Sequence, residues 1–516
     1  MDIGVAVAAH ARKTPDADAA FEGDRTLSYR ELDERTNRLA NLLTGRYGVA
    51  PGDRVAVLLR NRLEVAEAIV GVTKAGAVYC GLNFRMSLEE YRSILANAGA
   101  RVLVTEGPFR DMAATLADEF GLAVVDVDDP SEAGWGGLAS ASAAAPPTLH
   151  ARAPSDEFCI VYTSGTTGAP KGILFDAQAV ATHAMVAGLE YGMSRHSRWL
   201  TTIPHNSSVQ ITLAPTFFLG GAVGFLDGRG FDPHQFAAEA TTQAATHTYL
   251  VPTQLYRVLE AGLGHDDVAT LTSIGYGAAP IAHDRVGELV GRFGPVFSQL
   301  YGMAEVASIA TMLTQDDHRL IASGRSELMA SAGRASFLAD VRVVDADGRD
   351  CPPGERGEVR FHTPYTMRGY HRNPEKTAET LVDGWVRSGD VGMFDDEGYL
   401  YIVDRMKDLI IRGGYNITPS EIEHVLYSHP AVIEAAVVGV PDTEWGEAVL
   451  AAVALREGSG VDEAELRAHC KAAGLPSIKI PERVLTMDSL PKNAVGKIAK
   501  RAVAEIATTS SKPGGN

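Results

Sequence analysis

The chain has 516 residues, which is too long for one hydrophobic core, and we expect it to form about three compact units. Its residues are 45% hydrophobic and 22% charged, as in ordinary soluble globular proteins. The net charge of −18 repels nucleic acid and anionic membranes, so we expect neither as a partner, and an anionic substrate needs locally placed cations.

The cysteines and the N-terminus bear on the compartment. Cys80, Cys159, Cys351 and Cys470 are scattered without CxxC spacing, which argues against a zinc site or a disulfide framework and favours a reducing environment. The N-terminus lacks a basic segment before an apolar core, and no run of about 18 apolar residues occurs. We therefore expect a cytoplasmic protein without a membrane span.

The first half of the chain alternates helix and strand patterns. Ser28 and Glu31 form the pattern of a capping box, and leucines follow at helical spacing, so residues 28–46 predict a helix. Residues 53–59 predict a buried strand. Further strand patterns occur at residues 101–106, 158–163, 222–227 and 247–251. This alternation is typical of βαβ units and parallel sheets.

The pattern changes in the second half. Residues 339–362 contain two strand patterns joined by glycine and proline turns, which predict a smaller, mainly antiparallel section. Beyond residues 403–423, in which Pro419 opens a helix, short strands and a further helix near 462–471 follow. The predicted fold class is α/β: a large N-terminal domain of βαβ-built sheets with a small antiparallel β section, residues 1–404, and a small C-terminal α/β domain, residues 405–516.

Residues 162–172, YTSGTTGAPKG, combine glycines, hydroxyl side chains and one lysine directly behind an apolar strand pattern. This order gathers backbone N–H groups for phosphate oxygens, so a nucleotide is the first candidate ligand. The P-loop pattern does not fit, because five residues separate Gly165 from Lys171 and Gly172 follows the lysine. A flexible surface loop is the alternative interpretation.

Several motifs, taken in order, resemble those of the adenylate-forming enzymes, the superfamily of acyl-CoA synthetases, adenylation domains and luciferases. The phosphate loop is the first of them. The others are QLYGMAE, VRSGD, YIVDRMKDLIIRGGYNITPSEIE and PKNAVGK, at residues 299–305, 386–390, 401–423 and 491–497. The resemblance implies that the small C-terminal domain is mobile.

The resemblance also implies an ATP site. The implied nucleotide-binding residues are Thr163, Ser164, Gly165, Thr166, Thr167, Gly168, Gly277, Ala278, Ala279, Tyr301, Gly302, Asp390 and Arg405. Small residues at 277–279 let adenine lie against the backbone, with Tyr301 over its other face. Asp390 can accept both ribose hydroxyls, and Arg405 adds donors. The alternatives are a half-buried core tyrosine and a surface ion pair.

Three further residues are implied to carry the chemistry, because a carboxylate that attacks a phosphate brings two anions together. In the family, Lys171 contacts the outer phosphates, Glu305 ligates Mg²⁺, and Lys497 neutralises charge at the α-phosphate. A solvated charge is the alternative interpretation of Glu305. Ala304 stands where the family usually has a threonine, so one hydroxyl contact to the α-phosphate is missing.

The second half-reaction implied by the resemblance is attack of a thiol on the acyl-adenylate. The C-terminal domain would rotate about Lys407, removing Lys497 and bringing in Gly413 and Gly414. Glycines there let the narrow pantetheine arm of CoA pass close to the backbone. Such a rotation also keeps water from the adenylate.

His205, Ser207 and Met303 are the candidate acid-binding residues. Many acyl-CoA synthetases carry an aromatic-His pair where this chain has His205 and Asn206, and a structural histidine is the alternative interpretation. Residues 203–213 contain no Asp or Glu, whereas relatives that activate α-amino acids usually keep an aspartate there. A carboxylic acid without an α-amino group is therefore favoured.

The sequence thus predicts a ligase that uses ATP and Mg²⁺ to join a carboxylic acid to CoA. Transfer of the acyl group to a carrier protein or to an amine stays open, as do the identity of the acid and the oligomeric state, a homodimer included. A non-catalytic nucleotide sensor on the same scaffold is a further alternative. Against it stands the joint presence of Lys171, Glu305, Asp390 and Lys497, because binding alone does not need both lysines.

Overall fold

The computed structural model describes residues 2–131, 135, 152–163, 170–226, 230–442, 445–456, 458–492 and 498–510. It forms two compact units: Met1–Val341 with Phe361–Val386, and Arg342–Arg360 with Arg387–Asn516. Lys407, the predicted hinge, lies inside the second unit. Within the described ranges, no helix combines the length and the apolar character that crossing a membrane requires.

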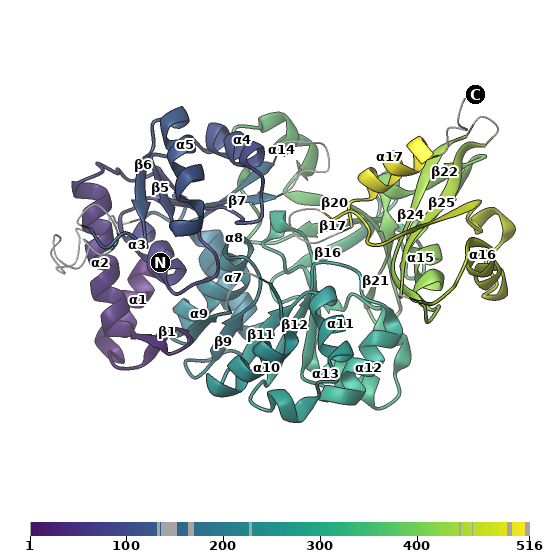
Figure 1. Cartoon of the computed structure of the whole chain (residues 1–516), viewed down its shortest axis with the longest axis horizontal. Helices are drawn as coiled ribbons and strands as arrows, with labels where there is room; N and C mark the ends of the chain where they lie inside the picture. The colour runs from purple at the N-terminus through teal and green to yellow at the C-terminus, as the bar shows by residue number, and fades with distance from the viewer. Residues whose placement is uncertain are drawn as a thin grey trace. The chain divides into compact units, whose positions relative to one another are not determined.

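A nine-stranded sheet forms one part of the first unit (Figure 1). Its strands, in spatial order, are β15 (Arg334–Ala335), β14 (Thr311–Leu313), β13 (Phe297–Tyr301), β12 (Ser273–Gly277), β11 (His247–Leu250), β9 (Arg198–Thr201), β10 (Ala222–Phe225), β1 (Asp18–Glu22) and β2 (Arg25–Ser28). The pairs from β1 to β13 are parallel, and antiparallel strands close both edges. This arrangement confirms the predicted α/β class.

A seven-stranded sheet forms the other part of the first unit. Its strands, in spatial order, are β18 (Gly369–Tyr370), β8 (Lys171–Asp176), β7 (Glu157–Thr163), β4 (Val78–Gly81), β3 (Arg54–Val57), β5 (Val102–Thr105) and β6 (Ala123–Asp126). The pairs from β7 to β6 are parallel, whereas β8 runs antiparallel to both β7 and β18. Because β7 and β8 are consecutive and antiparallel, they form a β-hairpin, and the predicted phosphate loop is the connection between them.

Helices connect the strands of the first unit, and some of them pack against its sheets. They are α1 (Ile3–Lys13), α2 (Tyr29–Gly45), α3 (Glu64–Lys74), α4 (Leu88–Ala98), α5 (Arg110–Phe120), α7 (Ala177–Glu190), α8 (His205–Ser208), α9 (Ala214–Leu219), α10 (Pro233–Thr242), α11 (Pro252–Glu260), α12 (His283–Phe293), α13 (Gln315–Ala322) and α14 (Pro374–Thr380). Helices α7 and α8 contact β7, and α9 contacts both α7 and β10. The two sheets therefore share one unit, and the chain forms two compact units rather than about three.

The predicted capping box is confirmed at the start of α2. Ser28 Oγ accepts a hydrogen bond from Glu31 N, and the Glu31 carboxylate accepts one from Ser28 N. Packing then fixes the helix against α3, because a Cβ at Gly71 would lie 2.4 Å from Leu39 Cδ2. A glycine at that position lets the two helices approach closely.

The second unit contains the predicted antiparallel section and the C-terminal α/β fold. The strands of the antiparallel sheet are β16 (Asp340–Val344), β17 (Gly357–His362), β20 (Trp385–Phe394), β19 (Leu381–Val382) and β21 (Leu400–Arg405). The boundary between the units passes through β16, β17 and β20, and β19 belongs to the first unit. The other sheet has β23 (Tyr415–Ile417), β22 (Ile410–Arg412), β25 (Gly446–Leu455), β24 (Val432–Asp442) and β26 (Arg483–Met487), with helices α15 (Pro419–Tyr427), α16 (Glu463–Ala472) and α17 (Lys500–Ser510).

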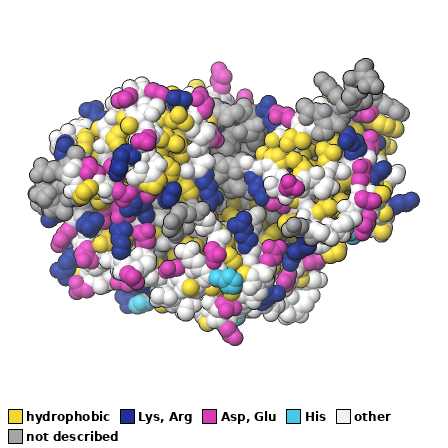
Figure 2. All heavy atoms as spheres, viewed as in Figure 1, with side chains coloured by type: hydrophobic (Ala, Val, Ile, Leu, Met, Phe, Trp, Pro, Cys, Tyr) yellow, Lys and Arg dark blue, Asp and Glu magenta, His cyan; other side chains and the backbone are white. Residues whose placement is uncertain are grey.

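Acidic and basic side chains are interspersed over the face shown in Figure 2. The net charge of −18 is therefore not gathered into a single acidic patch on this face. Charges of mixed sign at short spacing partly cancel at a distance.

Helix α3 is buried along its whole length, although it carries Glu64, Glu67 and Lys74. Lys74 Nζ lies 2.6 Å from Asp33 Oδ1, and Arg35 Nε lies 2.5 Å from Glu67 Oε1. An unpaired buried charge is costly, so these ion pairs permit a charged helix at the centre of the unit.

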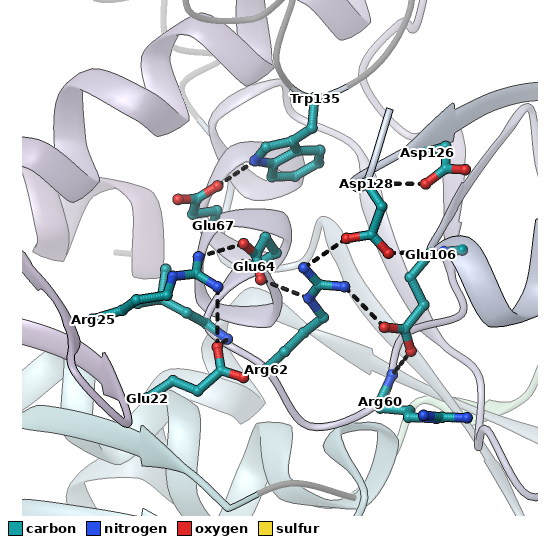
Figure 3. A network of polar contacts seen from close by, with 12 residues as sticks. Glu22, Arg25, Arg60, Arg62, Glu64, Glu67, Glu106, Asp126, Asp128 and Trp135 are labelled. Carbon is teal, nitrogen blue, oxygen red and sulfur yellow. Dashed lines mark hydrogen bonds and ion pairs between the residues drawn. The ribbon is translucent and has the colours of Figure 1, made fainter. Parts of the chain in front are cut away.

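Arg62 is the centre of the polar network in Figure 3. Its Nε lies 2.7 Å from Glu64 Oε2, its Nη1 2.9 Å from Glu106 Oε2, and its Nη2 2.9 Å from Asp128 Oδ1. Burial alone lowers the pKa of Arg62, but the hydrogen bonds to these carboxylates outweigh it and raise the pKa. One guanidinium thus pairs with carboxylates from three segments of the chain.

We expect Arg62→Ala to lower the free energy of unfolding by roughly 3 kcal/mol, because it leaves the buried Glu106 carboxylate without its counter-charge and Glu64 with Arg25 alone. Denaturant titration followed by circular dichroism measures the change. Arg92→Ala is the matched control, since Arg92 pairs with Glu119 at the surface and its loss should have little effect. Equal effects of the two substitutions would contradict the role assigned to Arg62.

Candidate functional site

The β7–β8 hairpin holds both ends of the predicted phosphate loop. Thr163 pairs with Lys171, and Tyr162 pairs with Gly172. The predicted loop residues Ser164, Gly165, Thr166, Thr167 and Gly168 lie outside the described residues. A hairpin differs from the strand–loop–helix of a P-loop, in agreement with the sequence pattern.

Lys171 and Glu305 meet through a tyrosine. Tyr370 Oη donates a 2.5 Å hydrogen bond to Glu305 Oε1, and Lys171 Nζ lies 5.8 Å from the centroid of the Tyr370 ring. Burial and the neighbouring Glu305 charge raise the pKa of Tyr370, so the phenol stays protonated and acts as the donor. The structure therefore brings together a cation and a carboxylate that lie far apart in the sequence.

Main-chain contacts fix this cluster. Tyr370 lies on β18 and pairs with Ile173 of β8, two residues beyond Lys171. Met367 N donates a 2.8 Å hydrogen bond to the carbonyl of Glu305. Because both contacts use the backbone, the placement of the three side chains depends on strand pairing rather than on flexible side-chain contacts alone.

The predicted adenine slot lies at the ends of two parallel strands. Gly277 ends β12 and pairs with Leu300 of β13, and a Cβ at Gly277 would lie 2.4 Å from the Leu300 carbonyl oxygen. Ala278 is exposed and Ala279 partly exposed, so the backbone there is open to a ligand. Tyr301 packs edge-on against Phe361, with ring centroids 5.8 Å apart.

A tight turn follows Tyr301. Ala310 N donates to the Tyr301 carbonyl, and a Cβ at Gly302 would lie 2.6 Å from the Ser308 carbonyl oxygen, which explains the glycine. Met303 is partly exposed, and its carbonyl accepts hydrogen bonds within the turn. Ala307 has a φ of 53° and Ser308 one of 82°. Such backbone strain in residues other than glycine is found at binding sites, where the surrounding structure holds it.

His205 opens α8, which continues directly into a π-helix at Val209–Leu213. The histidine is fully buried, and its Nδ1 lies 2.7 Å from Tyr79 Oη. Burial lowers the pKa of His205 to about 4, so the ring is neutral at pH 7. It can form hydrogen bonds but supplies no positive charge to a carboxylate. Ser207, on the next turn, is partly exposed.

Asp390 and Arg405 form a pair in the second unit. They are register partners on β20 and β21, and Arg405 Nε lies 3.0 Å from Asp390 Oδ1. Asp390 is only 7% exposed, whereas about half of the Arg405 side chain is exposed. Ser388 Oγ accepts a hydrogen bond from Asp390 N and fixes the backbone there. Because the Asp390 carboxylate is buried, the pair is not the surface ion pair that was the alternative interpretation of the sequence.

The predicted hinge and CoA segment also lie in the second unit. Lys407 is exposed on a short 3-10 turn, Met406–Asp408. Before it, Val403 O accepts a hydrogen bond from Ser420 Oγ, and Asp404 Oδ2 accepts one from Ser420 N at the start of α15. The segment on one side of Lys407 is thus tied to the helix on the other side.

Gly413 and Gly414 form the two-residue turn between β22 and β23, with φ angles of 55° and 84°. Positive φ at both positions is what a type I′ hairpin requires. A Cβ at Gly413 would also lie 2.8 Å from the Trp445 ring. These glycines therefore have a structural role, and contact with CoA stays a prediction. Lys497 lies outside the described residues.

Tyr370 is a site residue that the sequence reasoning missed. Its only local signal is a Gly-Tyr pair in an otherwise ordinary segment. Nothing in that segment reveals its partner, because Glu305 lies 65 residues away in the chain.

A family profile described as AMP-binding enzyme matches residues 7–371, and one described as AMP-binding enzyme C-terminal domain matches residues 421–497. The chain belongs to the AMP-binding enzyme family. It is 37% identical over 498 residues to a feruloyl-CoA synthase from an Amycolatopsis species, with 96% of each chain covered. The relatives of this adenylate-forming family are ligases.

Two solved structures of the family are similar over nearly the whole chain. ATP-bound MatB from Rhodopseudomonas palustris has a TM-score of 0.89 and 28% identity, and covers 99% of this chain and 100% of its own. The amide bond synthetase McbA from Marinactinospora thermotolerans has a TM-score of 0.87 and 32% identity, with 97% and 99% covered. The family resemblance drawn from the motifs is thus confirmed.

The buried His205 should make the fold less stable in acid. The unfolded chain binds its proton near pH 6.5 and the folded one only near pH 4, so stability falls as pH falls through this window. Between pH 7 and pH 5, protonation of His205 in the unfolded chain should lower the free energy of unfolding by roughly 2 kcal/mol. We expect the His205→Gln variant to lack this part of the decrease.

Denaturant titrations at the two pH values measure this difference. Tyr79→Phe removes the partner of His205 but keeps the histidine, so that variant should retain the pH dependence of the wild type. A His205→Gln protein with an unchanged pH dependence would show that the histidine is not buried and neutral.

Proposed function

We propose that the protein is an ATP-dependent acid–CoA ligase. A carboxylate oxygen of the acid attacks the α-phosphorus of ATP and pyrophosphate leaves, then the thiol of CoA attacks the acyl carbon and AMP leaves. The observation that carries the proposal is the cluster of Lys171, Tyr370 and Glu305 beside the predicted phosphate loop. The similarity to a feruloyl-CoA synthase and to ATP-bound MatB supports it.

The nucleotide-binding residues follow the predicted set. Residues 163–168 and Lys171 would hold the outer phosphates, and residues 277–279 with Tyr301 and Gly302 would hold adenine. Asp390, oriented by Arg405, would accept the ribose hydroxyls. His205, Ser207 and Met303 would contact the acid, with His205 as a neutral hydrogen-bonding group.

The donor set at Glu305 fits Mg²⁺. Tyr370 occupies Oε1, and Oε2 accepts no hydrogen bond from the described residues. Among those residues no cluster of three or more His, Cys, Asp or Glu is placed to hold a metal. Mg²⁺ usually binds one or two carboxylates together with substrate phosphates, so a single carboxylate oxygen suits it. When bound, the ion neutralises phosphate charge; Tyr370 holds the carboxylate in place.

Lys497 would neutralise charge between the carboxylate and the α-phosphate during adenylation. A rotation about Lys407 would then remove Lys497 and bring Gly413 and Gly414 to the thiol of CoA. An amine in place of the thiol is the second candidate acceptor, because the similar McbA is an amide bond synthetase.

The test is a pyrophosphate-release assay with aryl and aliphatic acids, followed by mass spectrometry of the products formed with CoA and with amines. We expect pyrophosphate release and a CoA thioester from wild type, and neither from Lys497→Ala. An amide product without a thioester would show that the acceptor is an amine and not CoA. No pyrophosphate release with any acid would reject the ligase.

We expect Glu305→Gln to require several-fold more Mg²⁺ for half-maximal pyrophosphate release, because it removes the charged ligand. The amide oxygen still accepts the hydrogen bond from Tyr370, so the fold should be kept. Glu327→Gln is a control on an exposed glutamate in the same unit. A Mg²⁺ titration that superimposes on that of wild type would show that Glu305 does not ligate the ion.

A further inference from the structure

Helix α14 holds the main chain of Tyr370 on the side that faces away from β8. Tyr370 N donates a 2.9 Å hydrogen bond to Thr377 Oγ1, and the Tyr370 carbonyl accepts one of 3.0 Å from Asn373 N. Strand β8 bonds to the next residue instead, since His371 N donates a 2.7 Å hydrogen bond to the Gly172 carbonyl. The backbone around Tyr370 is therefore fixed from two sides.

A glycine lets α14 come this close to β18. Gly369 has a φ of 149°, and a Cβ there would lie 2.8 Å from Thr377 Cγ2 and 2.9 Å from Thr377 Oγ1. Thr377 Oγ1 also donates a 2.8 Å hydrogen bond to the Asn373 carbonyl, so its single hydrogen is committed and its oxygen accepts from Tyr370 N. The helix thus packs directly against the two residues of β18.

Thr380, the last residue of α14, bonds to the Tyr370 hydroxyl. Burial and the charge of Glu305 raise the pKa of Tyr370, and a hydrogen bond with the Thr380 side chain opposes this rise. A hydrogen bond lowers the pKa of a phenol when the phenol oxygen accepts it, so the Thr380 hydroxyl is the donor. Thr380 and Tyr370 are both 7% exposed, so water has little access to this contact.

Two hydrogen bonds therefore connect Thr380 to Glu305. The Tyr370 oxygen accepts from Thr380, and its single hydrogen is donated to Glu305 Oε1 at 2.5 Å. A hydroxyl that accepts a hydrogen bond becomes a stronger donor, so Thr380 strengthens the bond from Tyr370 to Glu305. That bond determines which oxygen of the Glu305 carboxylate faces Tyr370 and which one remains for a cation.

We propose that Thr380 is a positioning residue of the ligase and that, through Tyr370, it orients the Glu305 carboxylate for the Mg²⁺ that binds with ATP. This rests on the proposed function and adds α14 to the elements that build the ATP site. Because Thr380 acts through Glu305, only the Mg²⁺-dependent part of ATP binding depends on its hydroxyl.

The test measures ATP binding by isothermal titration calorimetry, once with Mg²⁺ and once with EDTA in its place. We expect Mg²⁺ to tighten ATP binding by wild type, and to tighten it several-fold less in Thr380→Val, which keeps the shape of the side chain but not its hydroxyl. The ATP affinity in EDTA should be the same in both proteins. Thr380→Ser keeps the donor and should restore the Mg²⁺ response of wild type.

Thr73→Val is the matched control. Thr73 is 4% exposed, and its hydroxyl donates a 2.6 Å hydrogen bond to the Ile69 carbonyl inside α3. Loss of that bond should lower the temperature of unfolding and leave the Mg²⁺ response of ATP binding unchanged. If Thr380→Val does not fold, Thr380→Ala is compared with Thr380→Ser, because these two proteins differ in the hydroxyl alone.

Three outcomes overturn the inference. The first is a folded Thr380→Val protein with the Mg²⁺ response of wild type, which would limit Thr380 to packing and leave the proposed ligase standing. The second is a Thr380→Ser protein that responds to Mg²⁺ as Thr380→Val does, which would assign the effect to side-chain shape. The third is a wild type whose ATP binding does not respond to Mg²⁺ and that releases no pyrophosphate with any acid, which rejects the ligase as well.

Discussion

The main-chain pairing of β18 with β8 is the constraint on which the site of the first unit depends. Strand β18 has only two residues, yet it sets Tyr370 between Lys171 and Glu305. The same β8 begins at Lys171 and closes the hairpin of the phosphate loop. One short strand therefore couples the cation, the carboxylate and both ends of the loop, and side-chain rotation cannot separate them without breaking backbone hydrogen bonds.

Charge neutralisation is arranged differently in the core and at the site. In the core, Arg62 and Lys74 each form ion pairs with carboxylates, and these pairs hold the buried charges in a fixed arrangement. At the site, one oxygen of Glu305 accepts a hydrogen bond from a neutral phenol, which adds no positive charge. A carboxylate paired with a neutral donor keeps its attraction for a cation, which a carboxylate already paired with arginine largely loses.

The sequence predicted the parts of the fold that depend on local chemistry. The capping box at Ser28, the helix opened by Pro419 and the alternation of strands and helices all follow from residues close together in the chain. The motifs identified the family because each of them is also a run of residues close together in the chain. Tyr370 could not be found in this way, because its significance lies in a partner, Glu305, that lies 65 residues away in the chain.

The hydrogen bonds of Ser420 to Val403 and Asp404 link the segments on either side of Lys407. Any rotation about that lysine has to break them, and together they contribute about 2 kcal/mol. A difference of that size leaves the rotated conformation populated at a few per cent unless new contacts replace the lost ones. The equilibrium between the two conformations would then be governed by Ser420, which is not among the predicted nucleotide-binding or acid-binding residues.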